Sequence, residues 1–190
     1  MRFKHVAIEG CIGAGKTTVG KLVAQRLDAN FIGEDAEKNS FLSKFYSDPS
    51  RYAFETELGF LLIHFHQLFH RSAETVVTDF TLGKDRVFAQ MNLTGKDMNC
   101  FANLFADLSG RVAPPEIVVF LQLEPRFCLE RIRERGIPSE QSISVDYLKS
   151  LEAAYLRNLS ELGQSVRLIT VNRTDTISEV VDRAFSIIAA

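Results

Sequence analysis

The stretch that indicates the fold is Gly10-Cys11-Ile12-Gly13-Ala14-Gly15-Lys16-Thr17-Thr18. It matches the pattern G-x-x-x-x-G-K-[ST] of phosphate-binding loops. The apolar, β-branched residues before it predict a buried strand, and apolar residues at helical spacing from Val19 to Leu27 predict a helix after it. Inward-facing N–H groups and a helix N-terminus attract phosphate. The stretch therefore predicts a site for nucleotide phosphates. A glycine-rich turn without a ligand is the alternative, and the match at every fixed position argues against it.

Within this loop, Lys16 is expected to reach the terminal phosphates, and Thr17 is expected to place its hydroxyl on Mg²⁺. A nucleoside triphosphate is the expected ligand. The candidate nucleotide-binding residues of the loop are Gly10, Gly13, Ala14, Gly15, Lys16, Thr17 and Thr18.

Length and composition favour one domain over residues 1–190. The 22 basic and 24 acidic residues show no bias toward nucleic acid or a membrane surface. The three cysteines form no CxxC pair, which suits a reducing cytosol. There is no apolar run of the kind found in a signal peptide or a membrane span. We therefore expect a cytoplasmic protein that binds neither nucleic acid nor membrane.

Strand-like and helical patterns alternate along the chain. Strands are expected at Val6–Glu9, Asn30–Gly33, Thr75–Phe80, Glu116–Leu121 and Val166–Val171. Helices are expected at Ser50–Arg71, Glu124–Glu134, Val145–Leu162 and Thr176–Ile188. This alternation predicts an α/β fold, a five-stranded parallel sheet covered by helices on both faces. Ligands bind such sheets beyond the carboxyl ends of the strands, which draws attention to Glu34 and Asp79.

Three further segments accompany the loop: Phe31–Tyr52, Val77–Ala89 and Cys128–Leu148. Together with the loop they resemble the deoxynucleoside kinase family, from the loop to about Tyr155. The resemblance implies a P-loop kinase fold of three α/β/α layers with an arginine-bearing lid at about residues 131–143. It also implies transfer of the γ-phosphoryl group of ATP to the 5′-hydroxyl of a deoxynucleoside with Mg²⁺. A homodimer paired through the long helices is implied as well.

By this resemblance, Glu34 takes the proton of the 5′-hydroxyl, and Arg131 and Arg135 are the lid arginines. Glu140 and Tyr46 match the residues that contact the sugar 3′-hydroxyl. The chemistry is suitable, because a carboxylate can deprotonate a hydroxyl and guanidinium groups bind phosphate oxygens. The alternatives are a surface acid at Glu34, a solvated basic face for the arginines and an ordinary half-buried aromatic at Tyr46.

The chain departs from the family pattern at two arginine positions. Ile137-Pro138 stands where the lid has a further arginine. Asp79-Phe80-Thr81 stands where many members have an acidic residue, an arginine and a serine. Asp79 remains a candidate for organising Mg²⁺ or the acceptor, with Thr17 and Glu34. The missing arginine could be replaced by Lys84 or Arg86 from the next turn.

A third departure concerns the base. Glu57 stands where the family places a glutamine, and an ionised carboxylate offers only acceptors. The guanine edge has two adjacent donors, so Glu57 points to deoxyguanosine or a pterin-like ring. The alternatives are that Glu57 is protonated, or pairs with Arg86 or another cation. Phe54 is either a core residue or a residue that stacks on the base.

Two other functions compete with this interpretation. A nucleoside monophosphate kinase of the thymidylate kinase type shares the loop and the arginine lid, but it needs extra basic residues for the phosphate of its acceptor. A nucleotide-binding regulatory subunit with weak or lost catalysis is favoured by the missing arginines. The presence of Lys16, Thr17 and Glu34 opposes it.

Overall fold

The sheet has five parallel strands, as the sequence predicts. A computed structural model describes residues 3–71, 74–162 and 166–189. The strands lie in the order β2-β3-β1-β4-β5. Their bounds are β1 His5–Gly10, β2 Asn30–Ile32, β3 Val76–Thr78, β4 Ile117–Leu123 and β5 Val166–Val171. The α/β prediction is therefore confirmed.

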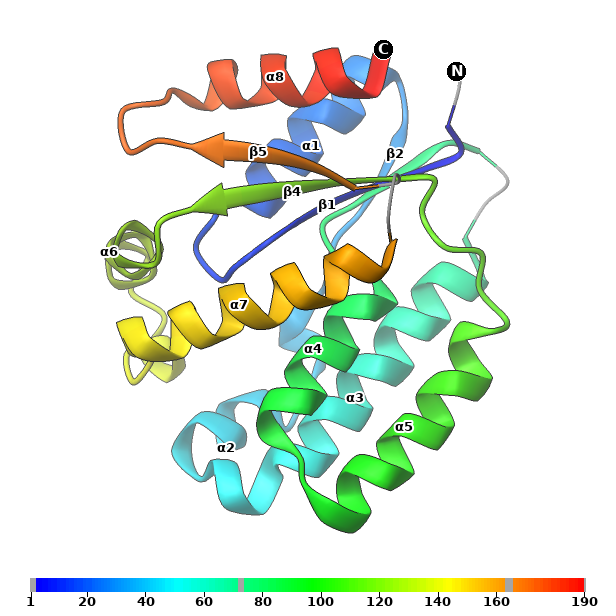
Figure 1. The fold of residues 1–190 in the computed structure, drawn as a ribbon, viewed down its shortest axis with the longest axis vertical. Coiled ribbons are helices and arrows are strands. Elements are labelled where there is room, and N and C mark those ends of the chain that lie inside the picture. Colours follow the sequence, from blue (N-terminus) through cyan, green and yellow to red (C-terminus); the bar gives the residue numbers. More distant parts are fainter. Residues whose placement is uncertain (1–2, 72–73, 163–165, 190) are drawn as a thin grey trace.

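Helices cover both faces of the sheet (Figure 1). Helices α1 (Lys16–Leu27) and α8 (Ile177–Ala189) lie on one face. The other layer contains α3 (Pro49–Phe69), α4 (Leu82–Asn92), α5 (Gly95–Ser109) and α7 (Val145–Leu162). Helix α6 (Pro125–Arg135) follows the carboxyl end of β4, and α2 (Leu42–Ser47) lies below it. Two 3-10 turns, Ala36–Lys38 and Pro138–Glu140, complete the elements.

Burial follows the position of each strand in the sheet. All six residues of the central strand β1 are buried, including the carboxylate of Glu9. The edge strands β2 and β5 are partly exposed. A second apolar cluster lies among α3, α4 and α5, so that these helices form a packed unit beside the sheet. The carboxyl ends of β1, β2 and β3 are thereby presented to this unit.

Three helices, α2, α4 and α5, were not among the sequence predictions. Helix α4 begins after Thr81, whose hydroxyl accepts a hydrogen bond from the Lys84 N–H. This capping hydrogen bond gives an acceptor to one of the backbone N–H groups that lack a partner at the helix start. The predicted strand Thr75–Phe80 is shorter in the structure, because the chain turns after Thr78 toward this cap. Asp79 therefore stands at the end of β3.

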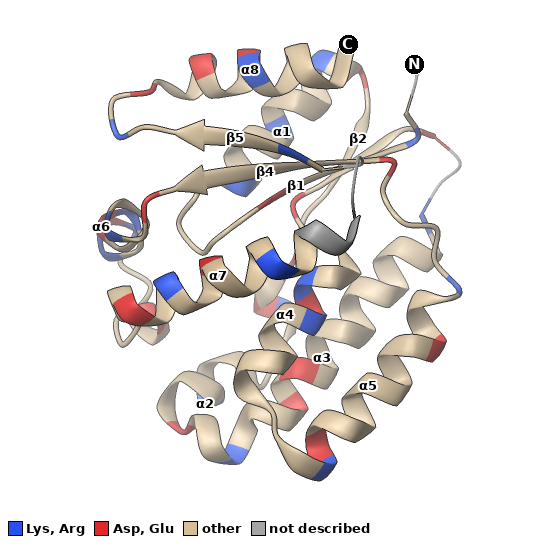
Figure 2. Ribbon diagram, viewed as in Figure 1, with Lys and Arg blue, Asp and Glu red and all other residues tan. Residues whose placement is uncertain are grey.

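Charged residues of both signs occur along α4, α6, α7 and α8 (Figure 2). This mixture agrees with the small net charge of −2. Among the described residues, no helix is both long and apolar enough to cross a lipid bilayer.

Candidate active site

The glycine-rich loop is closely packed against α6. Gly13 has φ +83°, and a Cβ at this position would lie 2.5 Å from the carbonyl oxygen of Cys128. The Lys16 Nζ donates to the Cys11 carbonyl, 3.1 Å away, which curls the loop around its own lysine. Burial and the charge of Lys84 lower the pKa of Lys16. The loop therefore has a fixed backbone conformation and holds the Lys16 ammonium group in place.

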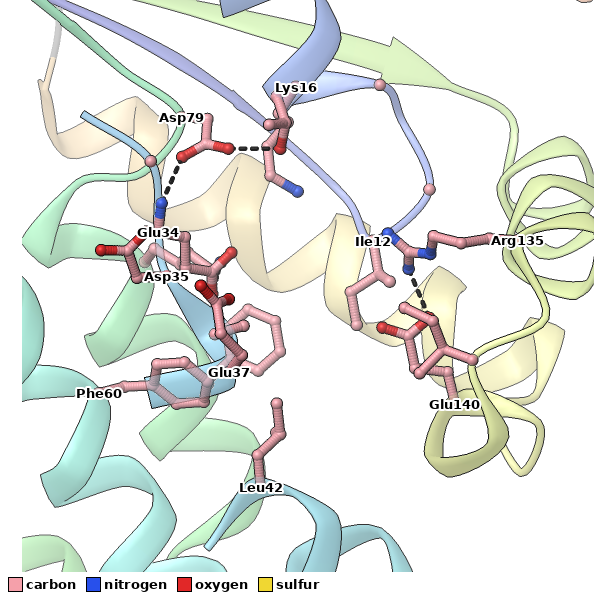
Figure 3. A pocket seen from close by; sticks show the side chains of 18 of the residues that line it. Ile12, Lys16, Glu34, Asp35, Glu37, Leu42, Phe60, Asp79, Arg135 and Glu140 are labelled. Atoms are coloured by element: carbon pink, nitrogen blue, oxygen red, sulfur yellow. Dashed lines mark hydrogen bonds and ion pairs between the residues drawn. The ribbon is translucent and has the colours of Figure 1, made fainter. Parts of the chain in front are cut away.

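A cavity of about 760 Å³ opens in front of this loop (Figure 3). Predicted site residues from the loop that line it are Gly13, Gly15, Lys16, Thr17 and Thr18. Those from elsewhere are Glu34, Tyr46, Glu57, Asp79, Arg131, Arg135 and Glu140. Residues as far apart in the sequence as Gly15 and Arg135 therefore line one cavity.

Four predicted site residues lie outside the lining. Gly10 is at the end of β1, and Ala14 is buried with its carbonyl toward Arg131. Phe54 packs against the cluster of α3, α4 and α5. The Arg86 Nε donates to the Asn158 side chain on α7 at 2.9 Å. Neither Phe54 nor Arg86 is among the residues that line the cavity, and the substrate contacts predicted for them stay predictions.

Asp79 joins the phosphate loop to the predicted acceptor residue. Its Oδ2 accepts from the Thr17 hydroxyl at 2.5 Å, and its Oδ1 accepts from the Glu34 N–H at 2.8 Å. Carboxylate and hydroxyl oxygens are the ligands that Mg²⁺ prefers, and it commonly takes one or two carboxylates together with substrate phosphates. The donor set of Thr17, Asp79 and Glu34 therefore fits a phosphate-bound Mg²⁺.

Lys84 is the cation that pairs with Glu34. Its Nζ forms an ion pair with Glu34 Oε1, and the Lys84 side chain is only 7% exposed. Burial opposes ionisation of Glu34, but Lys84, His64 and Lys16 outweigh it and lower its pKa to about 2. Of the two replacements that the sequence suggested for the missing arginine, Lys84 lines the cavity. Arg86, two positions further along the helix, points to a different side.

Glu9 supports the helix that carries Lys84. Its Oε1 accepts from the N–H and the hydroxyl of Thr81, at 2.9 and 2.8 Å. Burial raises its pKa to about 7, despite the nearby charges of Lys84 and Lys16. β1 and the start of α4 are therefore joined directly beneath the cavity.

Gln67 is a supporting residue that sequence reasoning missed. Its Nε2 donates to the Gly33 carbonyl and to Asp35 Oδ2, both at 2.9 Å. These bonds lie on either side of Glu34 in the chain, and Asp35 has a left-handed backbone with φ 52°. The turn is thus held by Gln67 on one side and by Asp79 on the other. A glutamine within a long helix gives no sequence signal for this role.

The lid arginines approach the cavity from α6. The Arg131 Nη1 donates to the Ala14 carbonyl at 3.3 Å, so the guanidinium lies over the phosphate loop. Arg135 pairs with Glu140 at 2.5 Å. In Figure 3, Arg135 and Glu140 lie across the cavity from Glu34 and Asp79. Tyr46 lies in the same wall as the lid, where burial and Glu140 raise its pKa.

The far end of the cavity contains polar groups without full pairing. Glu57 is 2% exposed, and its Oε1 accepts from the Asn92 side-chain amide at 2.8 Å. Its Oε2 has no hydrogen-bond partner among the described residues. Burial raises the pKa of Glu57 to about 8. The side-chain amide of Asn92 is therefore a hydrogen-bond partner of this carboxyl.

A buried histidine and aspartate lie beside this end. The His64 Nδ1 is 2.7 Å from Asp85 Oδ1, and the ring stacks on Phe80 with centroids 4.2 Å apart. Although burial opposes protonation, Asp85 raises the pKa of His64. Phe60 and Phe88 add apolar surface to the cavity. This end can hold a flat aromatic ring with polar edges.

Comparisons with known proteins agree with this geometry. The chain is 33% identical over 180 residues to a deoxyadenosine kinase of Dictyostelium discoideum, covering 91% of this chain and 74% of that protein. It is 29% identical over 176 residues to a deoxyguanosine kinase of Bacillus subtilis, covering 88% and 85%. The fold matches a structure of deoxyadenosine kinase from M. mycoides with TM-score 0.84 and 21% identity, over 97% and 98% of the two chains. The family described as deoxynucleoside kinase matches residues 6–189. The chain therefore belongs to the deoxynucleoside kinase family.

Proposed function

We propose that this chain transfers the γ-phosphoryl group of ATP to the 5′-hydroxyl of a deoxynucleoside. The observation that carries the proposal is the link from Thr17 through Asp79 to Glu34. It places a carboxylate suited to a hydroxyl acceptor beside the loop that binds the donor. In this proposal residues 1–190 form one kinase domain. The lid that closes over ATP spans about residues 131–143.

On the donor side, the loop N–H groups and Lys16 bind the β- and γ-phosphates. Arg131 and Arg135 place positive charge where negative charge accumulates during transfer, which is the main source of catalysis in this class of reaction. Thr17, Asp79 and Glu34 are the residues that would hold Mg²⁺. Bound there with ATP, the ion supplies charge neutralisation at the phosphates.

On the acceptor side, Glu34 is ionised and accepts the proton of the 5′-hydroxyl. The acceptor oxygen forms a bond to the γ-phosphorus as the bond from that phosphorus to the β,γ-bridging oxygen breaks, and ADP leaves with its electron pair. Glu140 and Tyr46 bind the sugar 3′-hydroxyl. Lys84 holds the Glu34 side chain in place and adds positive charge near the transferred group.

For the base, we propose that Glu57 favours guanine. The guanine edge donates from N1–H and from its 2-amino group, and Glu57 in its ionised form can accept both. The Oε2 of Glu57, which has no hydrogen-bond partner in the described part of the chain, supports this contact. A pterin-like ring carries the same pair of donors.

The test is release of ADP with Mg²⁺-ATP and each of the four deoxynucleosides, their monophosphates and a hydroxymethylpterin. Lys16→Ala is the blank, because it removes the phosphate-binding cation. We expect Lys16-dependent turnover with deoxynucleosides. Turnover with monophosphates alone would identify a kinase of the thymidylate kinase type. ATP binding without turnover of any acceptor would favour a regulatory subunit, and both results would contradict the proposal.

We also infer a cytoplasmic homodimer that pairs through its long helices. Two of the three cysteines, Cys11 and Cys128, are buried as free thiols, which suits a reducing compartment. Leu62 and Phe69 on α3 are large exposed apolar residues and would be covered by such pairing. Sedimentation at several concentrations tests the dimer.

A further inference from the structure

A second cavity, of about 290 Å³, lies at the opposite edge of the sheet from the phosphate loop. Its wall includes Lys4, which comes directly before β1, and Glu74, which comes shortly before β3. This cavity is therefore at the amino ends of the strands, whereas the active site is at their carboxyl ends. The end of α3 and the segment after α5 complete the wall, on the side of the molecule away from α6 (Figure 1). The two cavities share no lining residue among those that the structure describes.

Three cations line this second cavity: Lys4, Arg71 and Arg111. The acidic residue in the described wall is Glu74, so that the wall has an excess of two positive charges. None of the ion pairs found in residues 3–71, 74–162 and 166–189 involves Lys4, Arg71 or Arg111. An excess of unneutralised positive charge in a concave surface attracts anions.

The acidic residues beside the cavity are engaged by other groups. The Oε2 of Glu74 accepts from the Asn30 side-chain amide at 2.6 Å. The Oε2 of Glu116 accepts from the backbone N–H groups of Lys4 and His5, the latter at 3.2 Å. These carboxylates therefore stabilise the edge of the sheet and leave the three side-chain cations to a ligand.

Two of the cations are already placed to donate hydrogen bonds. The Nη1 of Arg71 is buried and has no hydrogen-bond partner among the described residues, and such an atom is costly. The Arg111 guanidinium lies over the stacked rings of Phe65 and Phe69, 5.0 Å from each centroid. A guanidinium that lies over a ring keeps the N–H groups at its edge available. An anion in the cavity would give both arginines an acceptor.

The chemistry of the wall suits a phosphate group. Guanidinium groups match phosphate oxygens with paired donors, and the Lys4 ammonium adds a point charge. The volume is close to the lower end of the range for small-molecule sites, about 300 Å³, so the ligand must be small. Leu68 and Val112 add apolar surface beside the cations, which can cover the organic part of a phosphate ester.

We propose that this cavity is a second anion site, which binds the phosphate group of a small molecule through Arg71, Arg111 and Lys4. Inorganic phosphate and a small phosphate monoester share this chemistry. The site is separate from the phosphate loop and does not depend on the proposed kinase function.

The experiment is calorimetric titration in the presence of a saturating non-hydrolysable ATP analogue. The analogue fills the phosphate loop, so that further phosphate binding reports on another site. The probes are inorganic phosphate and glycerol 3-phosphate, a small monoester. We expect saturable binding of at least one probe. Tighter binding of the monoester would identify a phosphorylated small molecule as the ligand, and equal or weaker binding would identify the free ion.

Arg111→Gln should weaken this binding by at least about tenfold, the effect of losing one charge-assisted hydrogen bond. Arg71→Gln should do the same. Because Arg111 is exposed, its variant keeps the test valid where Arg71→Gln fails to fold. Arg51→Gln is the matched control: Arg51 is an exposed arginine at the other end of α3, and its guanidinium also lies over a ring, 5.4 Å from the Tyr52 centroid. This control should keep the wild-type affinity.

Two results would overturn the proposal. One is equal affinity in Arg111→Gln and the wild type. The other is no saturable binding of either probe, as when a second copy of the chain covers Phe69 and closes the cavity.

Release of ADP separates the second site from the active site. Arg111→Gln should keep the Lys16-dependent ADP release of the wild type, measured without added phosphate, because Arg111 lies outside the active-site cavity. A loss as large as that in Lys16→Ala would place Arg111 in the active site and overturn the proposal of a separate site. Phosphate binding that depends on Arg111 in a chain without kinase turnover would contradict the kinase function alone.

Discussion

At the scale of single residues, the site depends on a few buried charges that neutralise one another. Lys84 and Glu34 form an ion pair with 7% and 22% of their side chains exposed, and Glu9 lies beneath them. Removing one member of such a pair leaves an uncompensated buried charge, which is strongly unfavourable. Lys84 is therefore the largest of the charges that keep Glu34 ionised, and it orients the Glu34 carboxylate.

Lys84→Gln should lower kcat by roughly 100-fold or more, the effect of losing one preorganised electrostatic group. The KM for ATP should change little, because Lys16 and the loop remain. Lys84→Arg should recover part of the activity, since it restores the charge. Steady-state kinetics on the three proteins measures this. Lys149→Gln removes an exposed lysine of α7 and serves as the control. Equal activity in Lys84→Gln and Lys149→Gln would refute the role given to Lys84.

At the scale of elements, the phosphate loop and the lid helix form one packed unit. Gly13 contacts the Cys128 backbone so closely that a Cβ has no space, and Arg131 returns from α6 to the loop. The element that binds ATP and the element that carries the arginines are therefore placed relative to each other by backbone contact.

Gly13→Ala should weaken ATP binding by tenfold or more, an order-of-magnitude expectation for a displaced phosphate site. It should also lower the melting temperature, because the added methyl group collides with backbone. Gly95→Ala is the matched control: Gly95 also has positive φ, at +56°, but has no heavy atom within 4 Å of the added Cβ. That control should cost about 1 kcal/mol of stability from backbone strain and leave ATP affinity unchanged. ATP titration by calorimetry compares the two, and equal affinities would contradict the packing argument.

At the scale of the whole molecule, the buried carboxyls of the site affect the stability of the fold. The pKa values of Glu9 and Glu57 are raised to about 7 and about 8. Below these values the folded chain retains protons that the unfolded chain has already released. The contribution of these two groups to stability must therefore fall as pH rises from their ordinary pKa of 4.5 to about 7 for Glu9 and to about 8 for Glu57. His5 acts in the opposite direction: its pKa is lowered from the ordinary 6.5 to about 3 in the folded chain, so its effect on the pH dependence of stability ends above about pH 7.

The melting temperature should therefore decrease between about pH 7 and about pH 8, above the range in which His5 titrates, with a loss of up to roughly 1.4 kcal/mol per pH unit from Glu57. Glu57→Gln should reduce this slope, because glutamine does not titrate. Glu55→Gln, at an exposed position two residues earlier on α3, should keep the slope. Thermal unfolding at constant ionic strength measures it. A slope that is the same in all three proteins would show that Glu57 does not titrate in this range.

The sequence by itself determined the fold class and the donor side of the site. The loop from Gly10 to Thr18 and the alternating strand and helix patterns depend on local spacing, so the order of the elements and the placement of Lys16 and Thr17 after the loop were predictable. Arg131 and Arg135 were assigned to the lid by the resemblance to the kinase family. Glu34 and Asp79 were also found, because the carboxyl ends of parallel strands meet at one edge of the sheet.

Only the tertiary structure decided which residues support Glu34 and Asp79. Lys84 and Arg86 look equivalent in sequence, and their directions follow from how α4 packs between α3 and α7. The hydrogen bonds of Gln67 to Gly33 and Asp35, the hydrogen bond of Asn92 to Glu57 and the packing of Phe54 against the cluster of α3, α4 and α5 join residues that are far apart in the chain. Such contacts depend on burial and on the relative placement of helices, which local spacing does not encode.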